Sequence, residues 1–107
     1  MTLYLTVNSS EPLPPGTPLR VEIRDTSQAD AAAVIVASQT TRVPASGDAI
    51  TVSIALERVP DGSTVWAHAD LDGDGRVSAG DFITMESYPV KRSGSEQRTT
   101  ITIRKVS

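Results

Sequence analysis

Apolar and polar side chains alternate along several stretches of this chain. Residues 3–7 read LYLTV and residues 19–25 read LRVEIRD, so that every second position is apolar. A period of two turns successive side chains to opposite faces of an extended strand, which buries one face and leaves the other in solvent. Similar stretches recur at residues 50–56, 63–71, 81–90 and 99–106. With one more at residues 33–43, the pattern predicts about seven strands.

Turn-forming residues separate these stretches. Proline, glycine and serine cluster at residues 12–16, 44–47, 60–62 and 93–94. Such residues punctuate short strands because they adopt the tight backbone conformations that turns require. Several short strands divided in this way are typical of an all-β sandwich or barrel.

The segment between residues 26 and 43 allows two interpretations. The alanines at residues 31–33 favour a helix, whereas the β-branched Val34, Ile35 and Val36 favour a strand. We expect a loop over residues 26–32, followed by a strand from about residue 33 to residue 43. A short helix over residues 28–33 is the alternative.

Composition narrows the classes of function. The 107 residues include no cysteine and carry a net charge of −3. The chain therefore forms neither disulfides nor thiolate metal sites, and its charge gives no support for a nucleic-acid partner. No apolar run approaches the ~18–20 residues of a membrane-spanning helix. Residues 1–7 also lack the basic start of a signal peptide. We expect a single domain over residues 1–107, with no nucleic-acid partner and no membrane span.

Acidic residues crowd into one short stretch, residues 69–81, which read ADLDGDGRVSAGD. Numbered from Asp70, aspartates stand at positions 1, 3, 5 and 12, and Gly75 stands at position 6. This is the spacing of a twelve-residue calcium loop of the EF-hand type, in which position 7 donates a backbone carbonyl and position 9 acts directly or through a water. The expected metal ligands are Asp70, Asp72, Asp74, Arg76, Ser78 and Asp81.

The loop departs from the EF-hand pattern in two ways. Position 12 is usually glutamate and here is Asp81, as in dockerin-type loops, so we expect weak binding in the micromolar to millimolar range. The flanking residues have the pattern of strands rather than helices, so the loop is expected at a hairpin tip at residues 70–81. The flexible all-oxygen shell suits Ca²⁺ better than Mg²⁺. The alternative is a polar turn without an ion, since Asp-Gly pairs form turns readily.

His68 is the one histidine, and it has no cysteine or activated serine as a catalytic partner. Alternation places it with Trp66 and Asp70, opposite the apolar face of its strand. We therefore expect a structural role for His68 and no enzymatic activity. The arginines on the strands, Arg20 and Arg24 among them, are expected to lie on solvent-facing surfaces.

The segment LPPGTPLRVEIRDTSQADAAAVIVASQ at residues 13–39 resembles the YbaY-type lipoprotein family, which is related to the lipoprotein chaperones (pilotins) of type III secretion. That family opens with a pattern like LPPxAxLxVxLxDxSxADAPxxxIAxQ. The corresponding residues are Leu13, Pro14, Pro15, Leu19, Val21, Ile23, Asp25, Ser27, Ala29, Asp30, Ala31, Ile35, Ala37 and Gln39, where Ile23 stands at the pattern's third leucine and Ile35 stands one residue before its isoleucine. A later phrase, TMESYPV at residues 84–90, is similar to the family's TDTAYPV.

The resemblance implies a small non-enzymatic β-sandwich of the bacterial envelope. We accordingly expect one antiparallel β-sandwich of about seven strands, immunoglobulin-like or transthyretin-like. Relatives usually have a short hairpin where this chain carries the acidic loop, so the calcium motif looks like an insertion. No lipobox cysteine is present, so a lipid anchor is not carried over.

Three functions follow from these observations. The one we favour is a structural calcium-binding module of an envelope, periplasmic or secreted protein, stabilised by Ca²⁺ because the ion binds only the folded form. The alternative is a pilotin-like chaperone that binds a segment of a protein partner along a sheet edge. A metal-assisted hydrolase is the third, and it would need an open coordination position beside a second functional group.

Overall fold

The computed structural model describes residues 1–26, 34–45, 50–57, 59–73, 75–91, 94 and 96–106. Every regular element in these residues is a strand, which confirms the all-β class. The strands are β1 (Thr2–Ser9), β2 (Pro18–Asp25), β3 (Val34–Arg42), β4 (Ile50–Ala55), β5 (Ser63–Ala69), β6 (Phe82–Thr84) and β7 (Glu96–Lys105).

The strands form one seven-stranded sheet in the order β3-β2-β5-β6-β7-β1-β4. The predicted antiparallel sandwich would pair all neighbouring strands antiparallel. Of the six neighbouring pairs in this sheet, however, β1 and β7 are parallel, with Thr2 opposite Glu96 and Ser9 opposite Ile103. The expected antiparallel sandwich is therefore replaced by a single mixed sheet. The physical reason is that β1 and β7 lie at opposite ends of the chain, so no hairpin turn dictates their relative direction.

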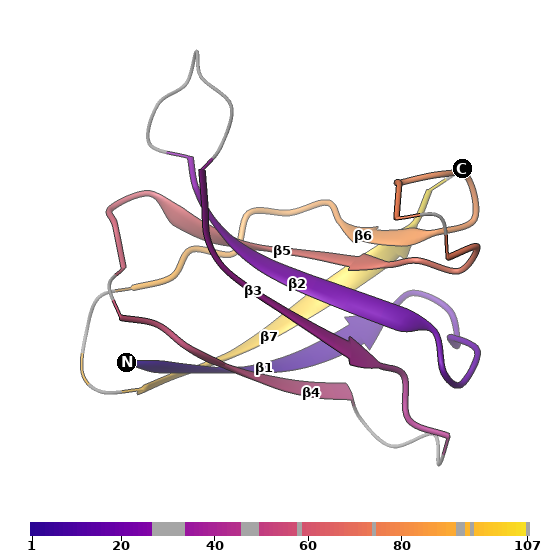
Figure 1. The fold of residues 1–107 in the computed structure, drawn as a ribbon, viewed down its shortest axis with the longest axis horizontal. Coiled ribbons are helices and arrows are strands. Elements are labelled where there is room, and N and C mark those ends of the chain that lie inside the picture. Colours follow the sequence, from indigo (N-terminus) through magenta and orange to yellow (C-terminus); the bar gives the residue numbers. More distant parts are fainter. Residues whose placement is uncertain are drawn as a thin grey trace.

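The sheet curls so far that its two edge strands, β3 and β4, approach each other (Figure 1). The result is a nearly closed barrel with an opening between β3 and β4. A curled sheet buries one face of every strand against the others, which a flat sheet of this size could not do without a second layer.

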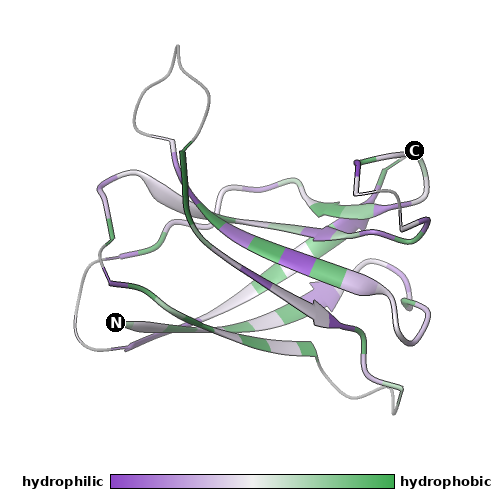
Figure 2. Cartoon of the chain, in the orientation of Figure 1, coloured by the Kyte–Doolittle hydropathy of each residue, from purple (hydrophilic) through white to green (hydrophobic). Residues whose placement is uncertain are grey.

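The core is built from the alternating apolar positions that the sequence singles out. Figure 2 shows the alternation most clearly along β2, where apolar and polar residues succeed one another. The buried strand residues share the inner face of the sheet, and they include Leu3, Leu5, Leu19, Val21, Ile23, Val52, Ile54, Val65, Ala67, Phe82, Ile101 and Ile103. Aliphatic side chains and one phenylalanine thus fill the interior.

Most strand predictions are confirmed to within a few residues. The exception is the stretch 81–90, where β6 covers only Phe82–Thr84. The chain then runs irregularly to a single bridge between Thr64 and Pro89. The expected loop at residues 26–32 and the alternative helix at residues 28–33 fall almost wholly outside the described residues, and β3 begins at Val34.

Candidate functional site

The acidic loop connects β5 to β6 and begins where the sheet ladder ends. Asp70 follows the last residue of β5, and its backbone N–H still donates to the carbonyl of Pro18 at the start of β2. Asp81 immediately precedes β6. The two ends of the loop are thus attached to neighbouring strands, and the carboxylates at both ends are buried.

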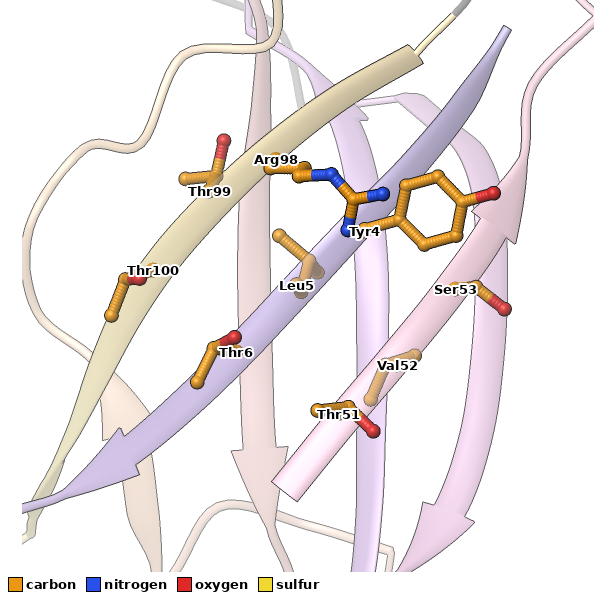
Figure 3. Close-up of a pocket in the computed structure, with 9 residues that line it drawn as sticks. All are labelled: Tyr4, Leu5, Thr6, Thr51, Val52, Ser53, Arg98, Thr99 and Thr100. Carbon is orange, nitrogen blue, oxygen red and sulfur yellow. The ribbon is translucent and has the colours of Figure 1, made fainter. Parts of the chain in front are cut away.

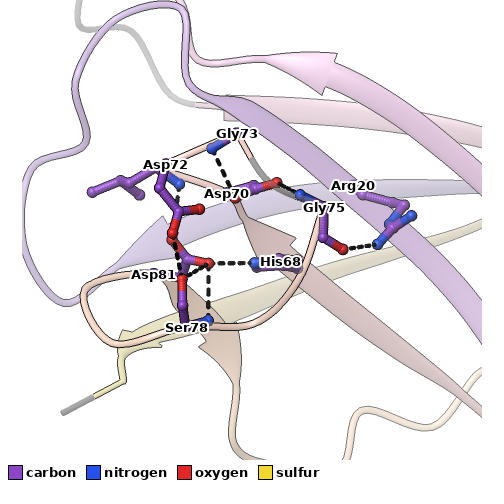
Figure 4. Close-up of polar contacts among 9 residues, drawn as sticks. Arg20, His68, Asp70, Asp72, Gly73, Gly75, Ser78 and Asp81 are labelled. Carbon is purple, nitrogen blue, oxygen red and sulfur yellow. Dashed lines mark hydrogen bonds and ion pairs between the residues drawn. The ribbon is translucent and has the colours of Figure 1, made fainter.

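Asp70 organises the first half of the loop. Its Oδ1 accepts from the N–H of Gly73 at 3.1 Å, and its Oδ2 accepts from the N–H of Gly75 at 2.7 Å (Figure 4). Gly75 has a φ of 76°, in the left-handed region that glycine occupies without strain. The bend expected at position 6 of the loop is therefore present.

Asp81 organises the second half. Its Oδ1 accepts from the N–H of Leu71 at 2.9 Å, and its Oδ2 lies 2.9 Å from Nε2 of His68 and 3.2 Å from the N of Ser78. Burial by itself raises the pKa of the Asp81 carboxyl, but the hydrogen bonds from His68, Leu71 and Ser78 outweigh it, so the pKa of Asp81 is lowered. The carboxylate is ionised at neutral pH, and Nε2–H of His68 is the donor.

The structure brings together four of the six expected ligands. Asp70 and Asp81 lie at the base of the loop, and Oγ of Ser78 donates to Asp72 at 2.6 Å and contacts Asp81 at 3.3 Å (Figure 4). The side chain of Arg76 is exposed. Asp74 lies outside the described residues. 

His68 also belongs to this cluster. The sequence placed it on the same strand face as Asp70 but did not include it in the loop. Among the described residues, one ligand atom each of His68, Asp70 and Asp81 lies within 4.8 Å of the others. The two carboxylates at this spacing are able to contribute oxygens to a divalent cation, whereas Nε2–H of His68 donates to Asp81 and holds that carboxylate in place. The parity of β5, which puts His68 and Asp70 on one face, was the signal available in the sequence. The burial of His68, with 1% of its surface exposed, supports the structural role predicted for it.

A second polar cluster covers the outer face of β2 and β5. Glu22 is buried and accepts from Nη2 of Arg24 at 2.6 Å, and the Arg24 guanidinium stacks on the Trp66 ring at 4.0 Å. The Trp66 and His68 ring centroids are 5.6 Å apart, which links this cluster to the acidic loop. Arg24 lies on the outer face, but only 32% of its side chain is exposed, because Glu22 on the same strand and Trp66 on β5 supply a partner and an aromatic surface.

The outer face of β7, β1 and β4 forms a shallow hollow of about 400 Å³ (Figure 3). Cross-strand rows of hydroxyl-bearing residues line it, with Thr6 between Thr51 and Thr100. In the next row the guanidinium of Arg98 lies 4.6 Å from the centre of the Tyr4 ring. The hollow is polar, and it has the composition expected of a solvated sheet face.

A second hollow, of about 350 Å³, lies at the opening between β3 and β4. The first residues of β3 and the last residues of β4 line it, together with Asp25, Glu57 and Pro60. Beside it, Val34 and Ile35 are exposed at 62% and 53%. No sequence signal pointed to this surface, because it exists only once β3 and β4 become the two edges of the sheet.

In the described part of the chain, no helix is long and apolar enough to cross a membrane.

Comparison with solved structures finds the same fold in an alternative pilotin from the type II secretion system of Vibrio cholerae. The TM-score is 0.72 at 21% sequence identity, and the alignment covers 100% of this chain and 97% of the pilotin. At this identity the likeness speaks for the fold alone. No curated protein sequence matches the chain.

The family model described as type III secretion system lipoprotein chaperone (YscW) matches residues 3–103. This confirms the relation to secretion chaperones expected from residues 13–39, whereas the YbaY-type resemblance itself and the inserted calcium loop stay predictions. The match supports the chaperone alternative over the calcium-binding module that the sequence favoured. Because it spans nearly the whole described sheet, this chain belongs to the YscW family of type III secretion system lipoprotein chaperones.

Proposed function

We propose that this protein is a pilotin-like chaperone of the cell envelope that binds a segment of a partner protein from a secretion apparatus. The match of the lipoprotein chaperone family to residues 3–103 carries the proposal. The fold also suits the role, since its two open sheet edges and the apolar hollow between them offer backbone and side-chain contacts to a polypeptide.

The proposed function is non-enzymatic. His68 donates to Asp81 from a buried position, which supports a structural role for its imidazole. A general acid or base must come within hydrogen-bond reach of the group it serves. Loss of His68 is therefore expected to affect stability rather than a catalysed reaction.

Crosslinking in the bacterium that encodes the chain tests the function. A tagged copy is crosslinked in cells, and covalently attached proteins are identified by mass spectrometry against an equally abundant envelope protein with the same tag. We expect one component of a secretion apparatus to be recovered, and its steady-state level to fall when the gene is deleted. Recovery no greater than in the control, together with an unchanged level, would contradict the proposal.

We also propose that the loop at residues 70–81 binds Ca²⁺ as a structural ion. The convergence of the Asp70 and Asp81 carboxylates within 4.8 Å supports this, as does the approach of Asp72 and Ser78 to Asp81. In the chaperone, the ion would neutralise the acidic cluster and hold the β5–β6 connection in place.

Thermal melting of chelator-treated protein tests the calcium site. Calcium at about 100 times its Kd should add about 2.7 kcal/mol to the free energy of unfolding, because the ion binds the folded state alone. Magnesium at the same concentration should add less, since it tolerates the all-protein shell poorly. The site is refuted if wild-type melts coincide in calcium and in EDTA.

A further inference from the structure

The two edges of the sheet lack two of the features that usually protect an edge strand. Natural edges carry charges or prolines that prevent another strand from pairing with them. Residues 34–41 of β3 and all of β4 contain neither. The free backbone groups of both strands are therefore open to pairing with an added chain.

The start of β3 also presents apolar side chains that no part of the described sheet covers. Val34 and Ile35 are adjacent, and each has more than half of its surface exposed. The β2–β3 register shifts between Ile23 and Arg24, which is a β-bulge. The shift leaves Val36 without a counterpart on β2, and a bulge there bends β3 next to Val34 and Ile35, the two residues that precede it.

Among the described residues that line the hollow, the charged side chains have one sign. They are Asp25 and Glu57, and none of these described lining residues is a lysine or arginine. The remaining lining residues are Val34, Ile35, Val36, Ala37, Ala55, Leu56 and Pro60, all without charge. A ligand that fits this surface is therefore apolar on one face and basic where it meets the exposed Glu57.

Resting on the function proposed above, we infer that the partner segment binds as an extended strand at this opening. It pairs with the edge of β3 along residues 34–37, places apolar side chains beside Val36 and Ala37, and directs lysine or arginine toward Glu57. One added strand raises the sheet from seven strands to eight. Eight is the number at which a small barrel closes with an interior filled by side chains. The partner thus completes the barrel.

A short peptide of defined pattern tests the inference on the wild-type protein. The probe is an end-capped seven-residue peptide that alternates lysine and valine. One control peptide alternates glutamate and valine, and the other has lysine and leucine at helical spacing. We expect the first peptide to bind at least tenfold more tightly than either control, and to slow hydrogen exchange of β3 backbone amides at residues 34–37.

A matched pair of variants locates the site. Ile35→Lys places a positive charge at the opening, and Met85→Lys makes the same change at a residue with 52% exposure outside the lining of the hollow. Both residues are exposed, so both variants should fold, as circular dichroism would verify. Ile35→Lys should weaken binding of the lysine–valine peptide at least tenfold, while Met85→Lys should leave it unchanged.

Three results would overturn the inference: no binding of the lysine–valine peptide, tighter binding of the helical peptide, or exchange protection confined to other strands. Concentration-dependent dimerisation through β3 would overturn it as well, because a second copy would then fill the opening. The crosslinking experiment described above tests the strand inference and the chaperone function separately. If Ile35→Lys still captures the crosslinked partner, the function stands and the strand inference fails; if the wild type captures nothing, the function itself fails.

Discussion

At the scale of single residues, the acidic loop is arranged around two buried carboxylates. Asp81 retains its charge with 1% of its surface exposed, because an imidazole and two backbone N–H groups donate to it. The sequence predicted the convergence of Asp70, Asp72, Ser78 and Asp81 from their spacing alone. It did not predict that His68 would donate to Asp81, since that contact depends on how the loop folds back on β5.

Replacing Asp81 with asparagine tests this arrangement. An amide offers one oxygen, so either the Leu71 N–H or the Ser78 N–H would face another donor in the buried site. We expect the free energy of unfolding to fall by about 1–3 kcal/mol in EDTA, measured by urea denaturation.

Asp72→Asn is the matched control, because Asp72 is exposed and accepts one hydrogen bond from Ser78. Its unfolding free energy in EDTA should stay within about 0.5 kcal/mol of the wild type. Equal losses in both variants would show that buried hydrogen bonding to Asp81 does not stabilise the loop.

Glu22 provides a second test at this scale. It is buried, with the Arg24 guanidinium at 2.6 Å and Trp66 beneath that guanidinium. We expect Glu22→Gln to lower the free energy of unfolding by about 1–2 kcal/mol, less than for a fully buried pair because a third of the Arg24 side chain is exposed. If the interaction between Glu22 and Arg24 is electrostatic, this fall in unfolding free energy should be smaller in 1 M salt. A fall that does not depend on salt would contradict an electrostatic origin.

At the scale of elements, alternation determined which residues form strands, but it did not fully determine how much of each strand is covered. Residues 50–56 and 33–43 both read as strands, and both become edges of the sheet. β4 alternates regularly between buried and exposed, whereas the first two residues of β3 are both exposed. The exposed fraction of a strand's side chains depends on which strands lie beside it and on the bulge in the β2–β3 pair. Neither can be predicted from the residues of that strand alone.

Two isoleucines on the edge strands test this difference. Ile54 of β4 is 4% exposed and Ile35 of β3 is 53% exposed. Ile54→Ala should lower the free energy of unfolding by about 2–5 kcal/mol, because it leaves a cavity in the core. Ile35→Ala removes the same atoms from a solvent-exposed position, so it should change the free energy of unfolding by no more than about 0.5 kcal/mol. Urea denaturation of both variants is the measurement, and equal losses would mean that the start of β3 packs in solution.

At the scale of the whole molecule, the parallel pairing of β1 with β7 holds the sheet together. β7 lies between β6 and β1, so it joins the four strands β3-β2-β5-β6 to the pair β1-β4. Within the sheet, the first and last strands of the chain thus become neighbours. Such contacts between distant segments make the fold cooperative, since neither part covers its apolar face without the other.

Truncation before β7 tests that cooperativity. A chain ending at residue 95 should lose dispersed amide signals in its NMR spectrum and its cooperative melt, because two new edges and the inner residues of β6 and β1 are exposed. A chain that lacks only residues 106–107 is the control and should keep both properties. A folded spectrum from the shorter chain would show that the β3-β2-β5-β6 portion is stable alone.

The sequence by itself determined the all-β class, the seven strands, the inward-facing residues and the spacing of the acidic loop. Each of these follows from local chemistry: a period of two, turn residues, and aspartates at alternate positions. Only the tertiary structure decided the single mixed sheet, the contact of His68 with Asp81, and the opening between β3 and β4. These depend on which distant segments meet, and free energy gained from long-range packing is not readable from any one stretch of the chain.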